Sequence, residues 1–313
     1  MMFSLAGGLF LGWSLGANDA ANVIGAAVTS RMLRFATAAW LAATFVLLGA
    51  MAEGQAGMET LSGLSNLDLE KAVAVSVAAA LTATIMTLLG LPISTSQAVV
   101  GGILGVGIIN RQMDFSGLGK VLACWVGTPI GGLVMAIIIY KILAAIYNWA
   151  NLNFVISDIV LRIGLVVAGC YGAYSLGANN VANVTGVFVG AGLISTATAC
   201  LVGGLSIGLG IVTFSRGVME TVGKKLVKLN PFSALVVVLA EAVTVHFYTF
   251  VGVPVSTSHA LVGAVIGVGL LRGGKTIGKS TLLAILTAWL LTPLVACFLA
   301  ICIYFCCHLQ YVN

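Results

Sequence analysis

The most constraining feature of this chain is that two polar motifs, each embedded in apolar sequence, occur twice. The sequence WSLGANDAANVIG at 13–25 returns 161 positions later as YSLGANNVANVTG at 174–186. The sequence GLPISTSQ at 90–97 returns 162 positions later as GVPVSTSH at 252–259. The nearly constant offset indicates that the two halves of the chain are copies of one unit.

A third pair extends the duplication through each half, because Met-Glu-Thr at 58–60 recurs at 219–221, again after 161 positions. The spacing predicts two domains, a first repeat at 1–150 and a second repeat at 151–313. Transporters built from two repeats bind substrate and ions near the bilayer midplane, where the repeats meet. We therefore expect the paired polar motifs to form a site between the repeats.

The amino-acid composition indicates that this chain lies in a membrane. Of its 313 residues, 60% are hydrophobic and 7% are charged, and several apolar stretches exceed the roughly 20 residues that cross a bilayer. The chain is therefore predicted to be an all-α polytopic protein of the cell membrane, plasma or inner, with the lipid bilayer as a partner. The net charge of +5 comes from lysine and arginine residues near the predicted loops, and it does not predict nucleic-acid binding.

Charged or turn-rich breaks divide each half into five apolar segments. Five crossings per half would place the second transmembrane repeat upside down relative to the first, since the number is odd. The segment after each proline of the second motif has only about 17 residues, so it either crosses the membrane or forms a re-entrant hairpin arm. The expected segments are 3–29, 35–52, 72–91, 93–109, 121–147, 159–189, 194–214, 232–251, 255–271 and 281–306.

Lysine and arginine residues test this topology, because the cytoplasmic loops of membrane proteins are enriched in them. With the N-terminus outside, eleven of the 14 fall on the cytoplasmic side and three on the outer side. We therefore expect both termini outside and the connection at 148–157 in the cytoplasm. The cytoplasmic set is Arg31, Arg34, Lys141, Arg162, Arg216, Lys224, Lys225, Lys228, Arg272, Lys275 and Lys279, and the outer set is Lys71, Arg111 and Lys120.

Asn18, Asp19 and Asn22 of the first motif lie three or four positions apart and so share one face of a helix. A carboxylate inside a membrane costs about 2.5 to 3.5 kcal/mol on insertion scales, so we expect Asp19 to face a cavity and a cation. Carboxylate and amide oxygens are hard ligands that suit Na⁺, and the second copy offers Asn180 and Asn183. The alternative is a hydrogen-bonded cluster that only packs helices together.

In the second motif, Pro92 and Pro254 break the preceding helix and are followed by the sequence Ser-Thr-Ser. Serine and threonine are strong N-caps, and a helix start offers an anion free N–H groups and the positive end of the helix dipole. We expect an anion site here, with two ordinary capped helices as the alternative. The candidate ligands are Ser94, Thr95, Ser96, Gln97, Ser256, Thr257, Ser258 and His259.

Three further acidic residues are less clearly placed. Glu59 and Glu220 of the Met-Glu-Thr pair, with Thr60 and Thr221, fall at predicted membrane boundaries, where a solvated carboxylate is equally expected. Glu241 lies in an apolar stretch without an acidic counterpart in the first repeat, so it is either an ion ligand or the partner of a neighbour.

The paired motifs resemble those of the inorganic phosphate transporter (PiT) family over essentially the whole chain. GANDAAN at 16–22, GANNVAN at 177–183, PISTSQ at 92–97 and PVSTSH at 254–259 carry the resemblance, together with the two Met-Glu-Thr sites. It implies two inverted repeats with broken helices or hairpins around a midplane site, and phosphate uptake driven by Na⁺ or H⁺, depending on the member. The chain departs from the pattern at Asn180, where many members carry aspartate, which puts the equivalence of the two cation sites in question.

The resemblance also implies roles for individual residues, and it raises the two Met-Glu-Thr glutamates above what spacing alone supports. Asn22 and Asn183 count as ligands of both phosphate and Na⁺. The candidate Na⁺ ligands are Asp19, Asn22, Asn18, Asn180, Asn183, Glu59, Glu220, Thr60, Thr221 and Glu241.

The expected function is symport of inorganic phosphate with a coupling cation, Na⁺ with H⁺ as the alternative, and without a catalytic cofactor. Phosphate near neutral pH carries close to two negative charges, which co-bound cations would neutralise. Symport of sulfate or another oxyanion and an uncoupled anion channel stay open as alternatives, as does a homodimer. An enzyme is not expected, because the sequence shows neither a nucleophile with a matching base nor an HExxH-type metal motif.

Overall fold

The computed structural model describes residues 5–29, 32–88, 93–226, 229–273 and 279–312, with the backbone alone at 220–226, 279–281 and 308–312. These residues form twelve helices and no strand, which confirms the predicted all-α class. The helices of the first half are α1 (Ala6–Val23), α2 (Gly25–Thr29), α3 (Phe35–Glu53), α4 (Gln55–Gly63), α5 (Leu69–Leu88), α6 (Thr95–Asn110) and α7 (Phe115–Ala150).

The second half repeats this order with fewer breaks. Its α8 corresponds to α1 and α2, its α9 to α3 and α4, and its last three helices to α5, α6 and α7. Ile24 and Gly54 interrupt the first-half helices at places where the second-half helices continue. The helices are α8 (Phe154–Gly190), α9 (Thr196–Leu226), α10 (Pro231–Val251), α11 (Thr257–Leu271) and α12 (Lys279–Val312).

Short polar side chains cap the N-termini of three long helices. Asp114 accepts hydrogen bonds from the first backbone N–H groups of α7, and Asn153 accepts one from Ile156 at the start of α8, at 2.9 Å. Asn230 does the same for α10, where Pro231 occupies the first helical position. These caps satisfy N–H groups that a helix start leaves without partners, so the apolar stretches begin at defined residues.

The two halves pack against each other reciprocally. Helix α1 lies against α9 while α8 lies against α3, and α7 lies against α11 while α12 lies against α6. A Cβ added to Gly16 would meet the carbonyl oxygen of Ile207, and one added to Gly177 would meet that of Val46. Both members of the second contact stand 161 positions from their equivalents in the first. Mutual contacts between equivalent residues are typical of a two-fold relation, here between the halves of one chain.

Helices α5 and α6 form one hairpin, and α10 and α11 form another. In each hairpin the end of the second helix lies beside the start of the first. Arg272, just after α11, donates from Nη1 to the Ser233 hydroxyl in the first turn of α10, at 3.2 Å. A Cβ on Gly107 near the end of α6 would meet the side chain of Ser65, which precedes α5. The short segments α6 and α11 therefore fold back antiparallel to α5 and α10 as the second arms of hairpins. The tip of the first hairpin, with Pro92, lies outside the described residues.

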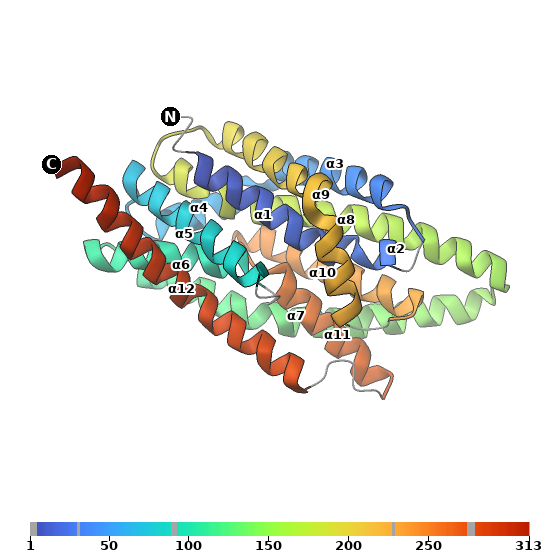
Figure 1. Cartoon of the computed structure of the whole chain (residues 1–313). Coiled ribbons are helices and arrows are strands. Elements are labelled where there is room, and N and C mark those ends of the chain that lie inside the picture. The colour runs from blue at the N-terminus through green and yellow to red at the C-terminus, as the bar shows by residue number, and fades with distance from the viewer. Residues whose placement is uncertain (1–4, 30–31, 89–92, 227–228, 274–278, 313) are drawn as a thin grey trace.

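Apart from its hairpin, each half has three further helical segments, which are α1–α2, α3–α4 and α7 in the first half. Three is an odd number, as is five when both hairpin arms are counted, so either count is consistent with an inverted repeat. Figure 1 shows the start of α1 and the end of α12 at one end of the bundle, and the connection between α7 and α8 at the other. Which end faces the cytoplasm stays a prediction.

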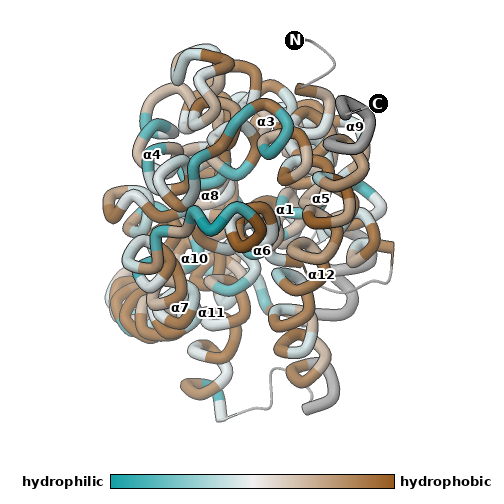
Figure 2. Tube along the Cα trace, turned by 90° about the vertical axis from the view of Figure 1, so that its left-hand side faces the viewer, coloured by the Kyte–Doolittle hydropathy of each residue, from teal (hydrophilic) through white to brown (hydrophobic). Residues whose placement is uncertain are grey.

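The outside of the bundle is apolar. Seven of the described helices, α3, α5, α7, α8, α9, α10 and α12, are long and apolar enough to cross a membrane. Figure 2 shows α7 and α12 mainly in the colours of hydrophobic residues. A bundle of this kind is a multi-pass membrane protein, and its polar motifs lie inside it.

Candidate functional site

The Ser-Thr-Ser runs form the predicted helix starts. Ser94 caps α6 and accepts a hydrogen bond from the backbone N–H of Gln97 at 3.4 Å, and Ser256 caps α11 and accepts one from that of His259 at 3.3 Å. All six residues of the runs are buried. Hydroxyls and N–H groups at a buried helix start favour a bound anion over bulk water.

Side chains of α1 meet the start of α11, which belongs to the other repeat. The Asn22 amide donates to the hydroxyls of Thr257 and Ser258, at 3.2 and 3.3 Å. The carboxylate of Asp19, which is buried, lies near the Thr257 hydroxyl. The structure thus brings the predicted cation ligands of the first motif into direct contact with the predicted anion ligands of the second motif.

The second copy of the first motif is arranged differently. The Asn183 amide donates to Asn180 Oδ1 at 2.9 Å, within α8. Asn180 occupies the position that Asp19 has in the first repeat. Its amide oxygen accepts from Asn183, whereas the equivalent amide of Asn22 donates to the hydroxyls of α11. Asn183 Oδ1 and Asn180 Nδ2 are buried without a partner among the described residues. The two copies are therefore not equivalent in this structure.

Several buried polar atoms of the candidate ligands have no partner among the described residues. They include both carboxylate oxygens of Glu241, whose side chain lies close enough to Asp19 for the two charges to interact. Buried polar atoms in folded proteins are nearly always hydrogen-bonded, so such a group indicates a place for a ligand. The unpartnered atoms are Gln97 Oε1, Asn180 Nδ2, Asn183 Oδ1, Glu241 Oε1 and Oε2, and His259 Nε2.

Na⁺ suits this donor set, because it offers carboxylate, amide and hydroxyl oxygens in a buried place. Asp19, Asn22 and Glu241 are the described residues that would hold it. No group of three or more histidine, cysteine or acidic side chains that could hold a metal ion occurs among the described residues, so the set does not fit a transition metal.

Asn18 and its counterpart Asn179 attach the first motif to the hairpins. Asn18 Nδ2 donates to the Thr87 hydroxyl at 3.1 Å, and Asn179 Nδ2 donates to the Thr249 hydroxyl at 3.3 Å. Asn179 also accepts from the Val255 N–H at 2.7 Å and donates to the Val253 carbonyl at 3.1 Å. Our sequence analysis missed Asn179, although its repeat counterpart Asn18 was a candidate.

Two further side chains hold the second hairpin tip. The Thr60 hydroxyl of α4 donates to the carbonyl oxygen of Gly252, and Lys120 Nζ of α7 donates to that of Val251 at 2.9 Å. With Asn179, they form a clasp of three helices around residues 251–255. The clasp fixes the backbone that leads directly into Ser256 and the buried start of α11.

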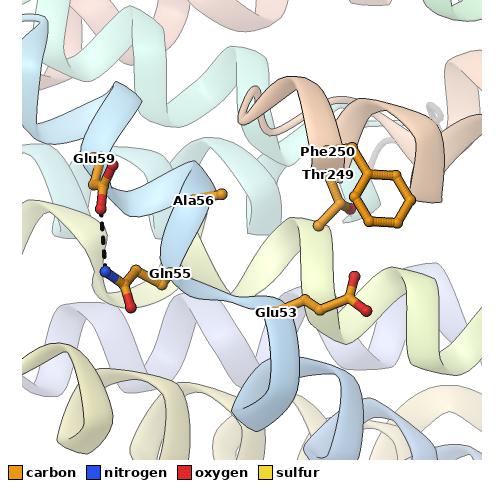
Figure 3. A pocket seen from close by; sticks show the side chains of 6 residues that line it. All are labelled: Glu53, Gln55, Ala56, Glu59, Thr249 and Phe250. Carbon is orange, nitrogen blue, oxygen red and sulfur yellow. Dashed lines mark hydrogen bonds between the residues drawn. The ribbon is translucent and has the colours of Figure 1, made fainter.

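Glu59 lies apart from these groups, exposed on α4, where its carboxylate accepts a hydrogen bond from Gln55 Nε2 at 3.1 Å. It lines a pocket of about 410 Å³ together with Glu53, Thr249 and Phe250. Figure 3 shows Glu59 and Gln55 paired on one side and the Glu53 carboxylate pointing toward Phe250 on the other. The side chains of Glu220 and Thr221 lie outside the described residues.

Buried polar helix starts inside an apolar multi-pass bundle define a membrane transport protein. The chain belongs to the phosphate transporter family, because the model of that family matches residues 15–300. It is 28% identical to the "Putative phosphate permease TK2061" of Thermococcus kodakarensis, over 95% of each chain. It is 29% identical to the "Sulfate permease CysP" of Bacillus subtilis, over 91% of this chain and 82% of that protein.

A solved structure, "The sodium-dependent phosphate transporter", has the same fold. The TM-score is 0.86, and the match covers 98% of both chains at 23% sequence identity. The likeness supports the bundle and its hairpins; the roles of individual residues rest on the contacts described above.

Proposed function

We propose that this protein carries inorganic phosphate across the cell membrane together with Na⁺, by alternating access between its two repeats. The observation that carries the proposal is the contact of Asp19 and Asn22 with Thr257 and Ser258. A cation held by the first two residues would lie beside an anion held at the start of α11. In a site of low dielectric constant the two charges stabilise each other, so each ligand raises the affinity for the other.

Hydrogen-bond acceptors favour phosphate over sulfate as the substrate. Phosphate keeps at least one proton near neutral pH for much of the time and can donate it, whereas sulfate is an acceptor only. Gln97 Oε1 and Asn183 Oδ1 are buried acceptors without donors among the described residues. A sulfate ion would leave such acceptors unpaired, and this costs binding energy. Sulfate stays the second candidate, because a sulfate permease is among the relatives.

Uptake into proteoliposomes tests the proposal. We expect labelled phosphate to accumulate against its gradient only when Na⁺ is higher outside, and an imposed pH gradient alone to drive much less uptake. A tenfold excess of unlabelled sulfate should reduce phosphate uptake by less than half. Phosphate flux that never exceeds equilibrium would identify an uncoupled channel, and stronger competition by sulfate than by phosphate would identify a sulfate carrier.

A further inference from the structure

A second polar cluster lies where α3, α8 and α10 meet, away from the helix starts of the phosphate site. His246 Nε2 is 2.8 Å from Glu53 Oε2, and His246 Nδ1 is 2.8 Å from the Tyr171 hydroxyl. Tyr174 donates from its hydroxyl to Glu53 Oε1 at 2.7 Å. We call these four residues the histidine cluster.

The equivalent place in the other half is apolar. Glu53, Tyr171 and Tyr174 correspond to Phe214, Phe10 and Trp13 at the offset of 161, and His246 corresponds to Thr84 at the offset of 162. The Trp13 ring packs 5.9 Å from Phe10 and 5.1 Å from Phe214, centroid to centroid. Aromatic packing therefore suffices to join these helices, and the fold does not require the ionisable groups of the histidine cluster.

The cluster is reached from the pocket that Glu53 lines. The side chains of His246 and Glu53 are 16% and 31% exposed, so the pair is neither sealed in the core nor fully solvated. Ionisable residues within a membrane protein's apolar helices are costly and usually functional. The same pocket contains Glu59 of α4 opposite Glu53 (Figure 3).

Other charged groups near α10 are engaged elsewhere. Lys120 of α7 bonds to the carbonyl oxygen of Val251 at the end of α10. Asp19 of α1 interacts with Glu241, which lies five residues before His246. Among the described ionisable groups, the histidine contacts Glu53 from α3 and Tyr171 and Tyr174 from α8.

The cluster can accept one proton without losing a contact. With neutral imidazole, Nε2–H donates to the Glu53 carboxylate and Nδ1 accepts from the Tyr171 hydroxyl. With a proton added to Nδ1, that nitrogen donates to the Tyr171 oxygen, because a phenol group is both donor and acceptor. The net charge of the pair then changes from −1 to 0, and the Glu53 contact becomes an ion pair between α3 and α10 in which both partners are charged.

We propose that the histidine cluster is a proton-binding site separate from the phosphate site, and that the proton bound there ties α3 to α10. Helix α10 is the first arm of the hairpin that presents Ser256, Thr257 and Ser258. A stronger tie between α10 and α3 resists movement of this hairpin relative to the other helices. This effect on transport rests on the proposed function, whereas the proton site itself does not.

A double-mutant cycle measured at two pH values tests the site directly. The thermal midpoint (Tm) of the purified protein is compared among wild type, Glu53→Gln, His246→Gln and the double variant. Histidine side chains in general change charge between about pH 5 and 8, so pH 5.5 and pH 8.5 compare the two sides of that range. We expect a coupling of about 3 °C in Tm at pH 5.5 and about 1 °C or less at pH 8.5.

Two more variants keep the test decisive. Phe247→Leu, on the exposed side of α10 next to the histidine, should change Tm equally at both pH values. If His246→Gln does not fold, Tyr171→Phe replaces it, because it removes the acceptor of the protonated Nδ1–H and keeps the ring. It should lower Tm more at pH 5.5 than at pH 8.5. Equal coupling at both pH values, or none at either, would overturn the proton site.

Phosphate uptake by His246→Gln, relative to wild type at the same pH, gives the transport readout, since this ratio cancels the titration of phosphate itself. We expect the uptake rate of the variant to be about three times that of wild type at pH 5.5 and nearly equal to it at pH 8.5. The reason is that the variant lacks the contact between His246 and Glu53, which must break when the hairpin moves. A ratio that is the same at both pH values refutes the tie during transport. Wild type without any uptake would refute the proposed function alone, and the Tm cycle would still decide on the proton site.

Discussion

Asp19 is the residue that distinguishes the two copies of the first motif. Its carboxylate lies near the Thr257 hydroxyl, and the Asn22 amide reaches across to α11. In the second copy Asn180 accepts a hydrogen bond from the amide of Asn183, and among the described residues Asn183 Nδ2 makes no such bond to the first hairpin. The acidic member of the pair thus belongs to the copy that contacts the other repeat, and we propose Asp19 as a ligand of the coupling Na⁺.

Asp19→Asn should weaken Na⁺ binding by about tenfold or more, because a neutral amide oxygen replaces a charged ligand. Through linkage, the apparent phosphate affinity at fixed Na⁺ should fall, and additional Na⁺ should partly restore it. Uptake curves at several Na⁺ concentrations measure both effects. Asp68→Asn is the control, since Asp68 pairs with Lys71 near the start of α5 at 3.0 Å. An Asp19→Asn protein with unchanged sodium dependence would remove Asp19 from the cation site.

At the scale of elements, the second hairpin is a broken helix whose tip is held by side chains from three other helices. Thr60, Lys120 and Asn179 bind consecutive carbonyl groups of 251–253, and these groups follow a helix end and have no helical partner. Thr60 therefore has a positioning contact here in addition to the ligand role that its motif implies. The clasp explains how a loop around Pro254 can hold a ligand-binding helix start in one place.

Lys120→Met should loosen this tip while leaving the bundle intact, because it removes the donor to Val251 and keeps a long apolar side chain. We expect backbone hydrogen exchange at 252–256 to become about tenfold faster, as for a loss of about 1.4 kcal/mol of local stability. Mass spectrometry of exchanged peptides measures it. Lys141→Met, an exposed position further along α7, should leave the same peptides unchanged; unchanged exchange in Lys120→Met as well would argue against the clasp.

The close crossings of helices depend on glycine. A Cβ at Gly177 would meet the backbone of Val46, so Gly177→Ala forces α8 and α3 apart. We expect a loss of about 1 to 3 kcal/mol in stability, as for other overpacked cores. Gly119→Ala in α7 is the matched control, since nothing lies within 4 Å of its added Cβ, and it should be neutral or slightly stabilising. Thermal unfolding compares the two variants, and equal midpoints would contradict the crossing argument.

At the scale of the whole molecule, the reciprocal packing has a consequence for transport. The helices α1, α9, α3 and α8 form one mutually packed set across the repeats, and α7 with α11 and α12 with α6 form the other contacts across them. Two equivalent hairpins therefore approach the middle from opposite halves of the chain. In the proposed mechanism, an exchange of conformation between the equivalent halves would open the site first to one side and then to the other.

The topology can be tested by labelling single cysteines in a cysteine-free background. A cysteine at position 111 should react with an impermeant reagent added outside, and a cysteine at position 225 should react only after permeabilisation. The expectation follows from the excess of lysine and arginine in the predicted cytoplasmic loops. Reaction at position 225 from outside would overturn the orientation and, with it, the proposed external termini.

The sequence by itself determined the helical segments, the duplication and the capped helix starts, because apolar length, repeat spacing and N-cap chemistry act locally. It left the short arms after Pro92 and Pro254 undecided between crossings and hairpin arms. Contacts such as Arg272 with Ser233 show that such an arm folds back along the helix before it.

The tertiary structure alone decided which polar side chains meet. The clasp on the second hairpin joins residues 74 to 192 positions apart in the chain, and the histidine cluster joins Glu53 to His246 over 193 positions. No local sequence pattern encodes such a pair, because the sequence around a single glutamate or histidine does not show whether its side chain faces lipid, water or a partner. Its role is set by the packing of whole helices, which depends on all their side chains at once.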